Sequence, residues 1–433
     1  MRSRCLAALT LVLSLASACT GGGGSSGPAA TSVAPVSPSA TASATSSPGL
    51  AHVSSSRISI EPSGTGSFLV HAAYPKTQSN CKHAHTARFR ARYPGALSVK
   101  SADDGTLSLV VTLPFEKYLE GIAEVPPSWP PAALEAQAVA ARSYALSHLN
   151  WSGQQGDEVQ QPICASTDCQ VYGGIHVPPT TGIGRWYAAV HHTEGQVLLY
   201  GGQPADTVYF STSNGHTYGN DQVFGSSPLP YLRPVVERDD GASPTSHWSV
   251  PIPFDDLTTF LTAGGVWPDG KRISSVYTAG SDVVVTGAGA STPIDAGTFR
   301  DTVNTWAPCL EPGRYPTGVL PATIPSDWYR VGSGDAGAVV IGRGWGHGVG
   351  MVQWGAYGKA KRGWSADQIL SYYYGGLTPQ QYPEPGLIHV IVASGLASLA
   401  IEAPTDGATI NGQPFEKGTV HLSGNAGTVT AGP

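Results

Sequence analysis

The sequence predicts an α+β chain with two lobes and a β-rich tail. Residues 106–113 alternate in the manner of a half-buried strand, and the alanine-rich stretch that follows residue 131 is typical of a buried helix. Residues 386–433 alternate apolar and polar positions around Gly and Pro turns. We therefore expect a domain over residues 58–385 and then a tail, which is either an edge hairpin or a small accessory module.

The first 18 residues have the layout of an export signal. Arg2 and Arg4 precede an apolar run, and the small residues 16–18 stand directly before Cys19. Such a site resembles a bacterial lipobox, in which Cys19 becomes the lipidated first residue; cleavage near Ala18 without lipid is the alternative. The sequence therefore predicts an extracytoplasmic protein, either anchored in the cell envelope by lipid or secreted.

Residues 19–57 are almost wholly Gly, Ser, Ala, Thr and Pro. A segment with so little large apolar surface does not offset the entropy lost on ordering, so we expect a disordered tether. Beyond the signal no apolar run is long enough to span a membrane, and we expect membrane contact through the lipid alone.

The charge balance argues against nucleic acid as a partner. The net charge is -6, and only 12% of residues are charged, whereas phosphate binding needs a basic surface. The chain instead carries 18 Tyr, 10 Trp and 54 Gly, a composition that favours a neutral polymer bound by aromatic faces and backbone groups. Outside the cell, carbohydrate is the obvious class.

Four cysteines remain once Cys5 in the signal and Cys19 at its end are set aside: Cys81, Cys164, Cys169 and Cys309. In an exported chain they favour disulfides, with the short segment "CASTDC" closed on itself and Cys81 bonded to Cys309. The alternative is zinc held by the short pair and a histidine such as His176. The spacing is not that of a CxxC pair, so we expect no metal and no cofactor.

The strand at 106–113 leads into a short helix over roughly 115–123, which places Glu124 at or just past the helix end. For the long helix that follows, we expect Ser128 as the N-cap and prolines in the first turn.

Further along the chain, residues around Gly201 and Gly202 predict a hairpin. A glycine-dense loop carries His347 and leads into a helix that ends at Gly363. Ser365 and Gln368 then predict a capping box at the start of the next helix.

Three acids surround the proline-rich stretch, and we expect chemistry from one of them. Glu120 lies on the polar side of the short helix, and Glu135 lies in the early turns of the long helix, where the dipole stabilises a carboxylate. Glu124 faces the negative end of the short helix in an apolar surround, and both effects raise the pKa of a carboxyl. A carboxyl that stays protonated near neutral pH is what a general acid requires.

Other chemistries fit less well. The glycine-dense loop around His347 does not indicate nucleotide binding, because it has neither a P-loop ending nor a G-x-G-x-x-G pattern. Ser211, Thr212 and Ser213 do not indicate a serine nucleophile, because no G-x-S-x-G sequence surrounds them. A metallopeptidase site at His191 and His192 is not indicated, because the two histidines are adjacent and form no H-E-x-x-H motif. Glycoside hydrolysis usually needs a second carboxyl, but one acid suffices if the C6 hydroxyl of muramic acid attacks C1 and forms a 1,6-anhydro ring.

Three blocks of sequence, in order, resemble the SpoIID/LytB domain of bacterial cell-wall proteins: "YLEGIAEVPPSWPPAALEAQAVAARSYAL", "YFSTSNGHT" with "PYLRPVVERDD", and "GRGWGHGVGMVQWGAYGKAKRGWSADQILSYYYGG". The resemblance implies a lytic transglycosylase that acts on peptidoglycan glycan strands, with Glu124 as the acid/base. It also implies a glycan groove between the lobes, lined by these residues: Arg142, Tyr209, Ser211, Thr212, Ser213, His347 and Gln353.

The resemblance leaves a second function open, because some members of the family modify a partner amidase and do not cleave glycan themselves. Some members also bind zinc through cysteines and histidines near "CASTDCQVY". Here Asp168 stands where that pattern would have histidine. The zinc site is therefore not expected in this chain.

Overall fold

The computed structural model describes five stretches of the chain, and the residue ranges are 53–75, 88–153, 158–175, 182–315 and 323–432. It contains helices and several sheets, so the α+β class is confirmed. The predicted signal, Cys19 and most of the tether lie outside the described residues. No helix in the described ranges is long and apolar enough to cross a membrane.

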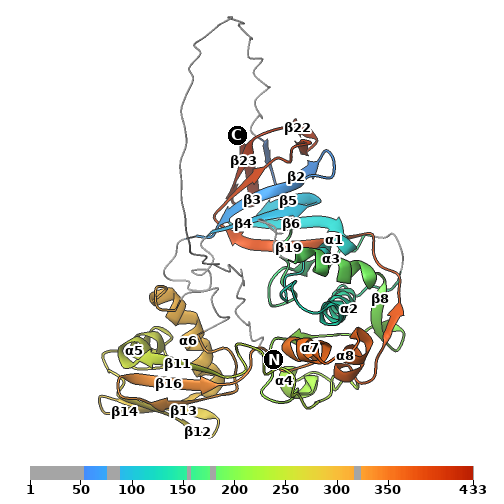
Figure 1. Cartoon of the computed structure of the whole chain (residues 1–433). Coiled ribbons are helices and arrows are strands. Elements are labelled where there is room, and N and C mark those ends of the chain that lie inside the picture. Colours follow the sequence, from blue (N-terminus) through green and yellow to red (C-terminus); the bar gives the residue numbers. More distant parts are fainter. Residues whose placement is uncertain (1–52, 76–87, 154–157, 176–181, 316–322, 433) are drawn as a thin grey trace, which may run out of the picture.

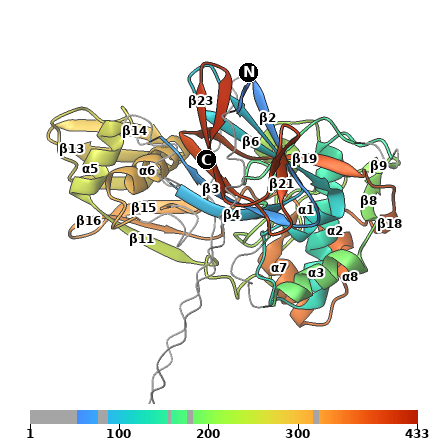
Figure 2. The same ribbon diagram turned by 90° about the horizontal axis from the view of Figure 1, so that it is seen from above.

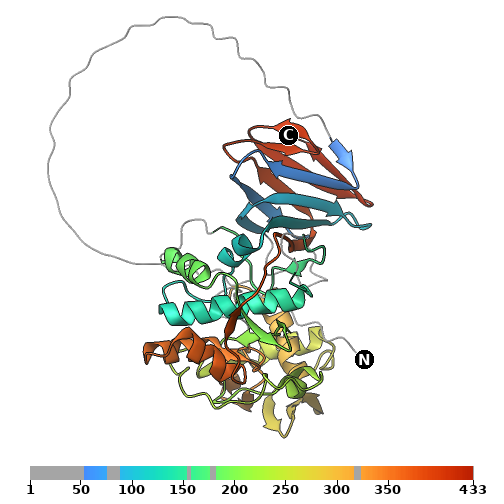
Figure 3. The ribbon, with the colours of Figure 1, turned by 90° about the vertical axis from the view of Figure 1, so that its right-hand side faces the viewer.

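Two sheets pack face to face at one end of the molecule (Figure 1, Figure 3). The strand order is β22-β21-β2-β5-β6-β19-β7 in one sheet and β1-β24-β23-β20-β3-β4 in the other. The strands are β1 (Val53–Ser55), β2 (Arg57–Pro62), β3 (Ser67–Ala73), β4 (Arg88–Pro94), β5 (Ala96–Ser101), β6 (Leu107–Pro114), β7 (Ile163–Cys164), β19 (Leu387–Leu396), β20 (Ser398–Glu402), β21 (Ala408–Ile410), β22 (Gln413–Phe415), β23 (Thr419–Asn425) and β24 (Thr428–Gly432). In β6, Leu107, Leu109, Val111 and Leu113 alternate into the core and are fully buried, as the sequence predicts.

Residues 386–433 are rich in strands, but they are not a separate tail. β19 pairs with β6, β20 with β3, and β24 with β1, all antiparallel. The first and last described parts of the chain therefore build the two sheets together. The expected boundary at residue 386 is wrong as a structural division, because strand pairing between distant segments leaves no local signal in the sequence.

A layer of helices lies beneath the sheets (Figure 3). It contains α1 (Phe115–Glu120), α2 (Pro131–His148), α3 (Ile183–His192), α7 (Gln353–Lys361) and α8 (Ala366–Tyr373), with the shorter α4 (Asn220–Phe224) beside them. The capping box of Ser365 and Gln368 is confirmed at the start of α8. Ser128 is not the N-cap of α2: Pro130 occupies that position with no side-chain cap, because Pro131 begins the helix.

Short strands connect the helical layer. β8 (Gln196–Tyr200) pairs with β9 (Gln203–Pro204) across the predicted Gly201-Gly202 turn, and β18 (Pro379–Gln381) joins β8. Tyr209 is not in that hairpin. It lies in β10 (Tyr209–Phe210), which pairs in parallel with β17 (Met351–Val352) and so brings two distant parts of the chain together.

The chain between Trp248 and Gly342 forms an inserted unit with its own hydrophobic core, seen apart from the helical layer in Figure 1 and Figure 2. It consists of β11 (Trp248–Pro253), α5 (Phe254–Ala263), β12 (Ser275–Ala279), β13 (Asp282–Gly287), β14 (Ala290–Asp295), α6 (Ala296–Leu310), β15 (Tyr329–Ser333) and β16 (Gly337–Gly342). The two helices pack against three-stranded sheets. We did not expect this separate unit from the sequence.

Candidate active site

Glu124 lies in the loop between α1 and α2 and is half-buried. Its Oε1 accepts a hydrogen bond from the backbone N–H of Val171 at 2.7 Å. Burial raises the pKa of Glu124 to about 7, and hydrogen bonds from Val171, Gln353 and Tyr209 oppose that rise. The carboxyl is therefore about half protonated at neutral pH and has hydrogen-bonding partners for its charged form.

The cause of this shift differs from our expectation in one respect. α1 ends at Glu120 with Gly121 as its C-cap, so Glu124 lies beyond the helix and not at its final turn. Burial is the largest cause of the raised pKa. The direction of the shift is as expected.

Tyr209 contacts Glu124 from β10, and its hydroxyl accepts a hydrogen bond from Gln170 Nε2 at 3.0 Å. Gln170 is fully buried, and its Oε1 accepts a bond from the Tyr118 hydroxyl at 2.8 Å. Because Gln170 supplies a donor to Tyr209, the phenolic proton is free to point toward Glu124. Burial raises the pKa of Tyr209 well above its usual value, so the phenol remains a donor.

One face of α2 packs against the segment that carries Gln170. Gln137, Ala141, Tyr144 and His148 recur at helical spacing along it. The Ala141 carbonyl accepts a bond from Gln170, and the Tyr144 ring stacks on that of His148 with centroids 5.7 Å apart. Alanine at this position lets the loop with Gln170 approach the helix backbone.

Gln353 begins α7 and is buried beside the site. Its side chain contacts Glu124, and its Nε2 lies 3.4 Å from Oε1 of Gln137. Among the residues that the structure describes, the buried Nε2 of Gln137 has no hydrogen-bond partner. The two amides thus connect α2 and α7 directly behind the carboxyl.

His347 does not face Glu124 directly; it fixes the strand that carries Tyr209. Its Nδ1 accepts the N–H of Val349 at 3.1 Å, so Nε2 carries the proton and donates to the Tyr209 carbonyl at 2.9 Å. Burial lowers the pKa of His347 to about 4, and the ring is neutral at physiological pH. Gly346 and Gly348, which flank it, have φ values of 112° and 86°, which glycine adopts without strain.

Ser211, Thr212 and Ser213 are buried in a network of hydroxyl groups. Thr212 Oγ1 is 2.6 Å from Ser243 Oγ, and both the N–H and the hydroxyl of Ser213 donate to Asp240 at 2.8 Å. These contacts fix the loop that follows β10. They leave little of these side chains for direct contact with a large substrate.

Arg142 is fully buried and does not line an open surface. Its guanidinium bonds Glu116 at 2.8 Å, Glu384 at 2.7 Å and the Val190 carbonyl at 3.2 Å. The expectation that it contacts substrate is therefore wrong. A charge so deeply buried requires these partners, and it ties α1 and α3 to the segment before β19.

Glu120 and Glu135 each lie near a histidine of α3. Glu120 bonds Lys117 at 2.8 Å and is 3.3 Å from His191, and Glu135 is 3.6 Å from His192. The two histidines therefore contact different acids, and they do not meet at one site. Neither acid contacts Glu124.

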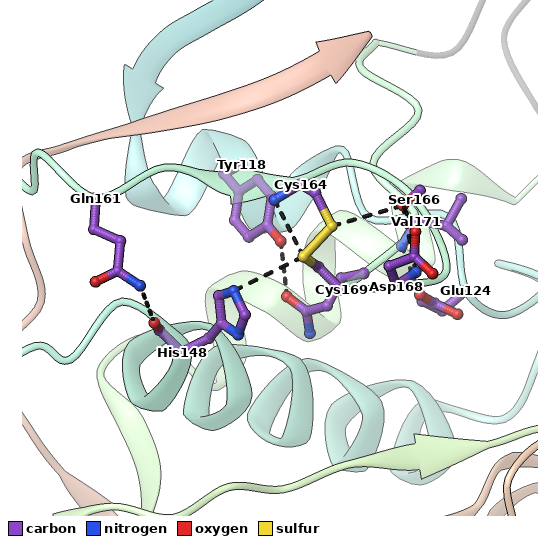
Figure 4. The surroundings of a disulfide bond; sticks show 10 residues. Tyr118, Glu124, His148, Gln161, Cys164, Ser166, Asp168, Cys169 and Val171 are labelled. Atoms are coloured by element: carbon purple, nitrogen blue, oxygen red, sulfur yellow. Dashed lines mark hydrogen bonds between the residues drawn. A yellow bond between two sulfur atoms is a disulfide. The ribbon is translucent and has the colours of Figure 1, made fainter. Parts of the chain in front are cut away.

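Cys164 and Cys169 form a disulfide with Cα atoms 5.5 Å apart (Figure 4). Their sulfur atoms lie between His148 and Glu124, and Cys169 Sγ is 3.8 Å from His148 Nε2. Cys309 is disulfide-bonded, but Cys81 and His176 lie outside the described residues, and the pairing of Cys81 stays a prediction. In the ranges that the structure covers, no group of three His, Cys, Asp or Glu side chains could hold a metal ion.

Tyr118, Gln137 and Gln170 belong to this site, but we did not predict them from the sequence. Gln170 directly follows the second cysteine, and Gln137 is a lone polar residue in an alanine-rich buried helix. A buried amide in such a helix needs a polar partner, and that was the available signal.

The SpoIID family model, described as Stage II sporulation protein, matches residues 103–200, a range that includes Glu124 and the disulfide. Stage II sporulation protein D of Bacillus subtilis is 29% identical over 62% of this chain and 74% of its own length. An uncharacterised protein of Brachyspira hyodysenteriae is 30% identical over 67% of this chain and 73% of its own length. The amidase enhancer of Bacillus subtilis is 30% identical over 60% of this chain but only 39% of its own length. The chain belongs to the SpoIID/LytB family.

Proposed function

We propose that the protein is a lytic transglycosylase that cleaves the MurNAc–GlcNAc bond of peptidoglycan glycan strands, with Glu124 as its acid and base. The observation that carries this proposal is a half-buried carboxyl whose pKa is raised to about 7 and which three neutral donors surround. A general acid that must later act as a base is most effective when its pKa lies near the working pH.

In the first step, Glu124 gives its proton to the glycosidic oxygen as the bond from that oxygen to C1 of MurNAc breaks. The carboxylate then removes the proton of the C6 hydroxyl while O6 bonds to C1. The product is a 1,6-anhydro ring, no water is consumed, and Glu124 regains its proton. The donors from Val171, Gln353 and Tyr209 stabilise the carboxylate between the two steps.

A single carboxyl is consistent with the surroundings of Glu124. In the described part of the chain, burial raises the pKa of Glu124, three neutral donors lower it, and no carboxylate is among these causes. Hydrolysis of a glycoside normally requires a second carboxyl a few ångströms away, as nucleophile or base. An internal nucleophile on the sugar removes that requirement.

We infer that the glycan lies across the half-exposed face formed by Glu124, Tyr144 and Tyr209, in a groove beside the helical layer. Tyr209 and Gln353 are the direct contacts to the acid, whereas His347 and Ser211–Ser213 hold the segments that carry them. This proposal assigns substrate contact to fewer residues than the resemblance implies.

We also propose an extracytoplasmic location with a lipid on Cys19, supported by the basic start, the apolar run and the small residues before that cysteine. The variant Cys19→Ser should lose membrane association, and cell fractionation should then recover it in the soluble fraction. If the variant stays as firmly associated as the wild type, the anchor is not at Cys19.

A second function, glycan binding that enhances a cell-wall amidase, is supported by the likeness to the amidase enhancer of Bacillus subtilis. The two functions differ in what Glu124 does. An enhancer would not need a carboxyl with a raised pKa.

The test is turnover of purified glycan strands by the wild type, Glu124→Gln and Glu135→Gln. We expect Glu124→Gln to lose at least about a hundredfold in rate while it still binds glycan, because it keeps the shape and loses the proton. Glu135→Gln should stay within a few fold of the wild type. Equal cleavage by wild type and Glu124→Gln would contradict the assignment.

A further inference from the structure

The segment from Cys164 to Cys169 joins the edge of a sheet to the candidate active site. Cys164 ends β7, which pairs in parallel with β19, and the disulfide connects this strand to Cys169. Between the cysteines, Thr167 and Asp168 are exposed. Ala165 is held by backbone hydrogen bonds to Ile391 and Tyr172, and the disulfide is the covalent cross-link between this loop and the strand.

The residues directly after Cys169 contact both Glu124 and Tyr209. Gln170 donates to the Tyr209 hydroxyl at 3.0 Å, and the N–H of Val171 donates to Glu124 at 2.7 Å. The Val171 carbonyl in turn accepts the N–H of Ala123, next to the acid. A displacement of the chain at Cys169 would therefore move two hydrogen bonds of the site together.

We propose that the Cys164–Cys169 disulfide is a positioning element for Glu124, which holds the Val171 N–H and the Gln170 amide on the acid and on Tyr209. Reduction adds two electrons and two protons, breaks the S–S bond and leaves two thiols, so Cys169 loses its cross-link to the end of β7 and is held there only by the intervening chain and its hydrogen bonds. The protein would then carry a correctly placed acid only in its oxidised form. The role in catalysis rests on the proposed function, but the effect on Glu124 itself does not.

The groups that face Glu124 allow the direction of the effect to be stated. Tyr118 from α1, Tyr144 from α2 and Tyr209 from β10 interact electrostatically with it, and burial raises the pKa of each phenol, so all three stay neutral. Asp168 in the loop and Asp206 interact with Tyr144. A hydrogen bond to a carboxylate favours the charged form, so loss of the Val171 bond should raise the pKa of Glu124.

The experiment is an NMR titration of protein labelled with 13C at the glutamate carboxyl, with the Glu124 signal assigned from Glu124→Gln. We expect a pKa of about 7 in the wild type, and a value roughly one unit higher in the double variant Cys164→Ser/Cys169→Ser. Cys309→Ser is the control, because it removes a disulfide from α6 in the inserted unit and should leave the titration unchanged. An unchanged or lowered pKa in the double variant would overturn the proposal.

A second measurement covers the case in which the double variant does not fold. Cys309→Ser is treated while folded with a water-soluble phosphine, which becomes its oxide with oxygen from water as the disulfide becomes two thiols. The Glu124 titration should move up as before, and re-oxidation should reverse the change. A titration that does not move after complete reduction would again contradict the proposal.

Activity gives a further readout. If the wild type cleaves glycan, reduction should lower kcat by about tenfold with little change in KM, and should move the alkaline limb of the pH profile upward. If the wild type cleaves nothing, the proposed function fails, yet the titration still tests whether the disulfide positions Glu124.

Discussion

The raised pKa of Glu124 is a cost to the fold. A carboxyl in the unfolded chain loses its proton near pH 4.5, whereas in the folded protein the pKa is about 7. The folded state therefore holds the Glu124 proton more tightly than the unfolded chain does. Relative to the ionised carboxyl, the protonated carboxyl makes the fold more stable, and this contribution to the free energy of unfolding is complete below the unfolded pKa of 4.5. The contribution is lost as the pH rises through the folded pKa of about 7, so the stability of the fold decreases between pH 4.5 and pH 7.

Glu124→Gln should remove this cost. At pH 8 the variant should be more stable than the wild type by about 1–3 kcal/mol, and at pH 4 the two should be nearly equal. Denaturant unfolding at both pH values measures the difference. Glu120→Gln is the control, since that side chain is paired with Lys117 and should show no such gain. If Glu124→Gln were less stable than the wild type at pH 8, the claim that the ionised Glu124 side chain destabilises the fold would be contradicted.

Among the helices and strands, the features that depend on neighbouring residues could be predicted. The capping box at Ser365 and the alternation of β6 are set by local hydrogen bonding and burial. Ser128 failed as an N-cap because consecutive prolines already preset the backbone where α2 begins. Gln170 could not be placed, since its partners Tyr118 and Tyr209 are far away in the sequence.

The α2 face beneath the site makes a further prediction. Ala141 is fully buried, and its carbonyl accepts the bond from Gln170. In Ala141→Leu the added side chain should displace the loop with Gln170, lower glycan cleavage strongly and destabilise the fold by about 1–3 kcal/mol. Ser147→Leu, in the last turn of the same helix and less buried, should cost far less. Equal activity of the two variants would show that the close approach at Ala141 is unimportant.

At the scale of the whole molecule, the site is supported by strands from distant parts of the described chain. β19 lies between β6 and β7, and these strands lead into α1 and into the disulfide loop. The sequence indicated strands after residue 386 but not their partners. The inserted unit between Trp248 and Gly342 was missed for the same reason, because its core forms from residues distant in sequence.

Removal of residues 386–433 should therefore abolish folding and not merely delete an accessory module. Both sheets would lose interior strands, and the hydrogen bonds of β6 and β3 would be left open. Circular dichroism and thermal unfolding measure the outcome, and a chain beginning at Val53 is the control that should fold. A truncated chain that unfolds cooperatively, like the control, would contradict this view.

The central claim is that Glu124 transfers a proton while the sugar supplies its own nucleophile. Purified glycan strands are incubated with the wild type in water labelled with oxygen-18, and the new ends are weighed by mass spectrometry. We predict 1,6-anhydro-MurNAc ends that contain no heavy oxygen, and their absence from the Glu124→Gln sample. Reducing ends that carry one heavy oxygen would show hydrolysis instead, and intact strands together with a faster partner amidase would show an enhancer.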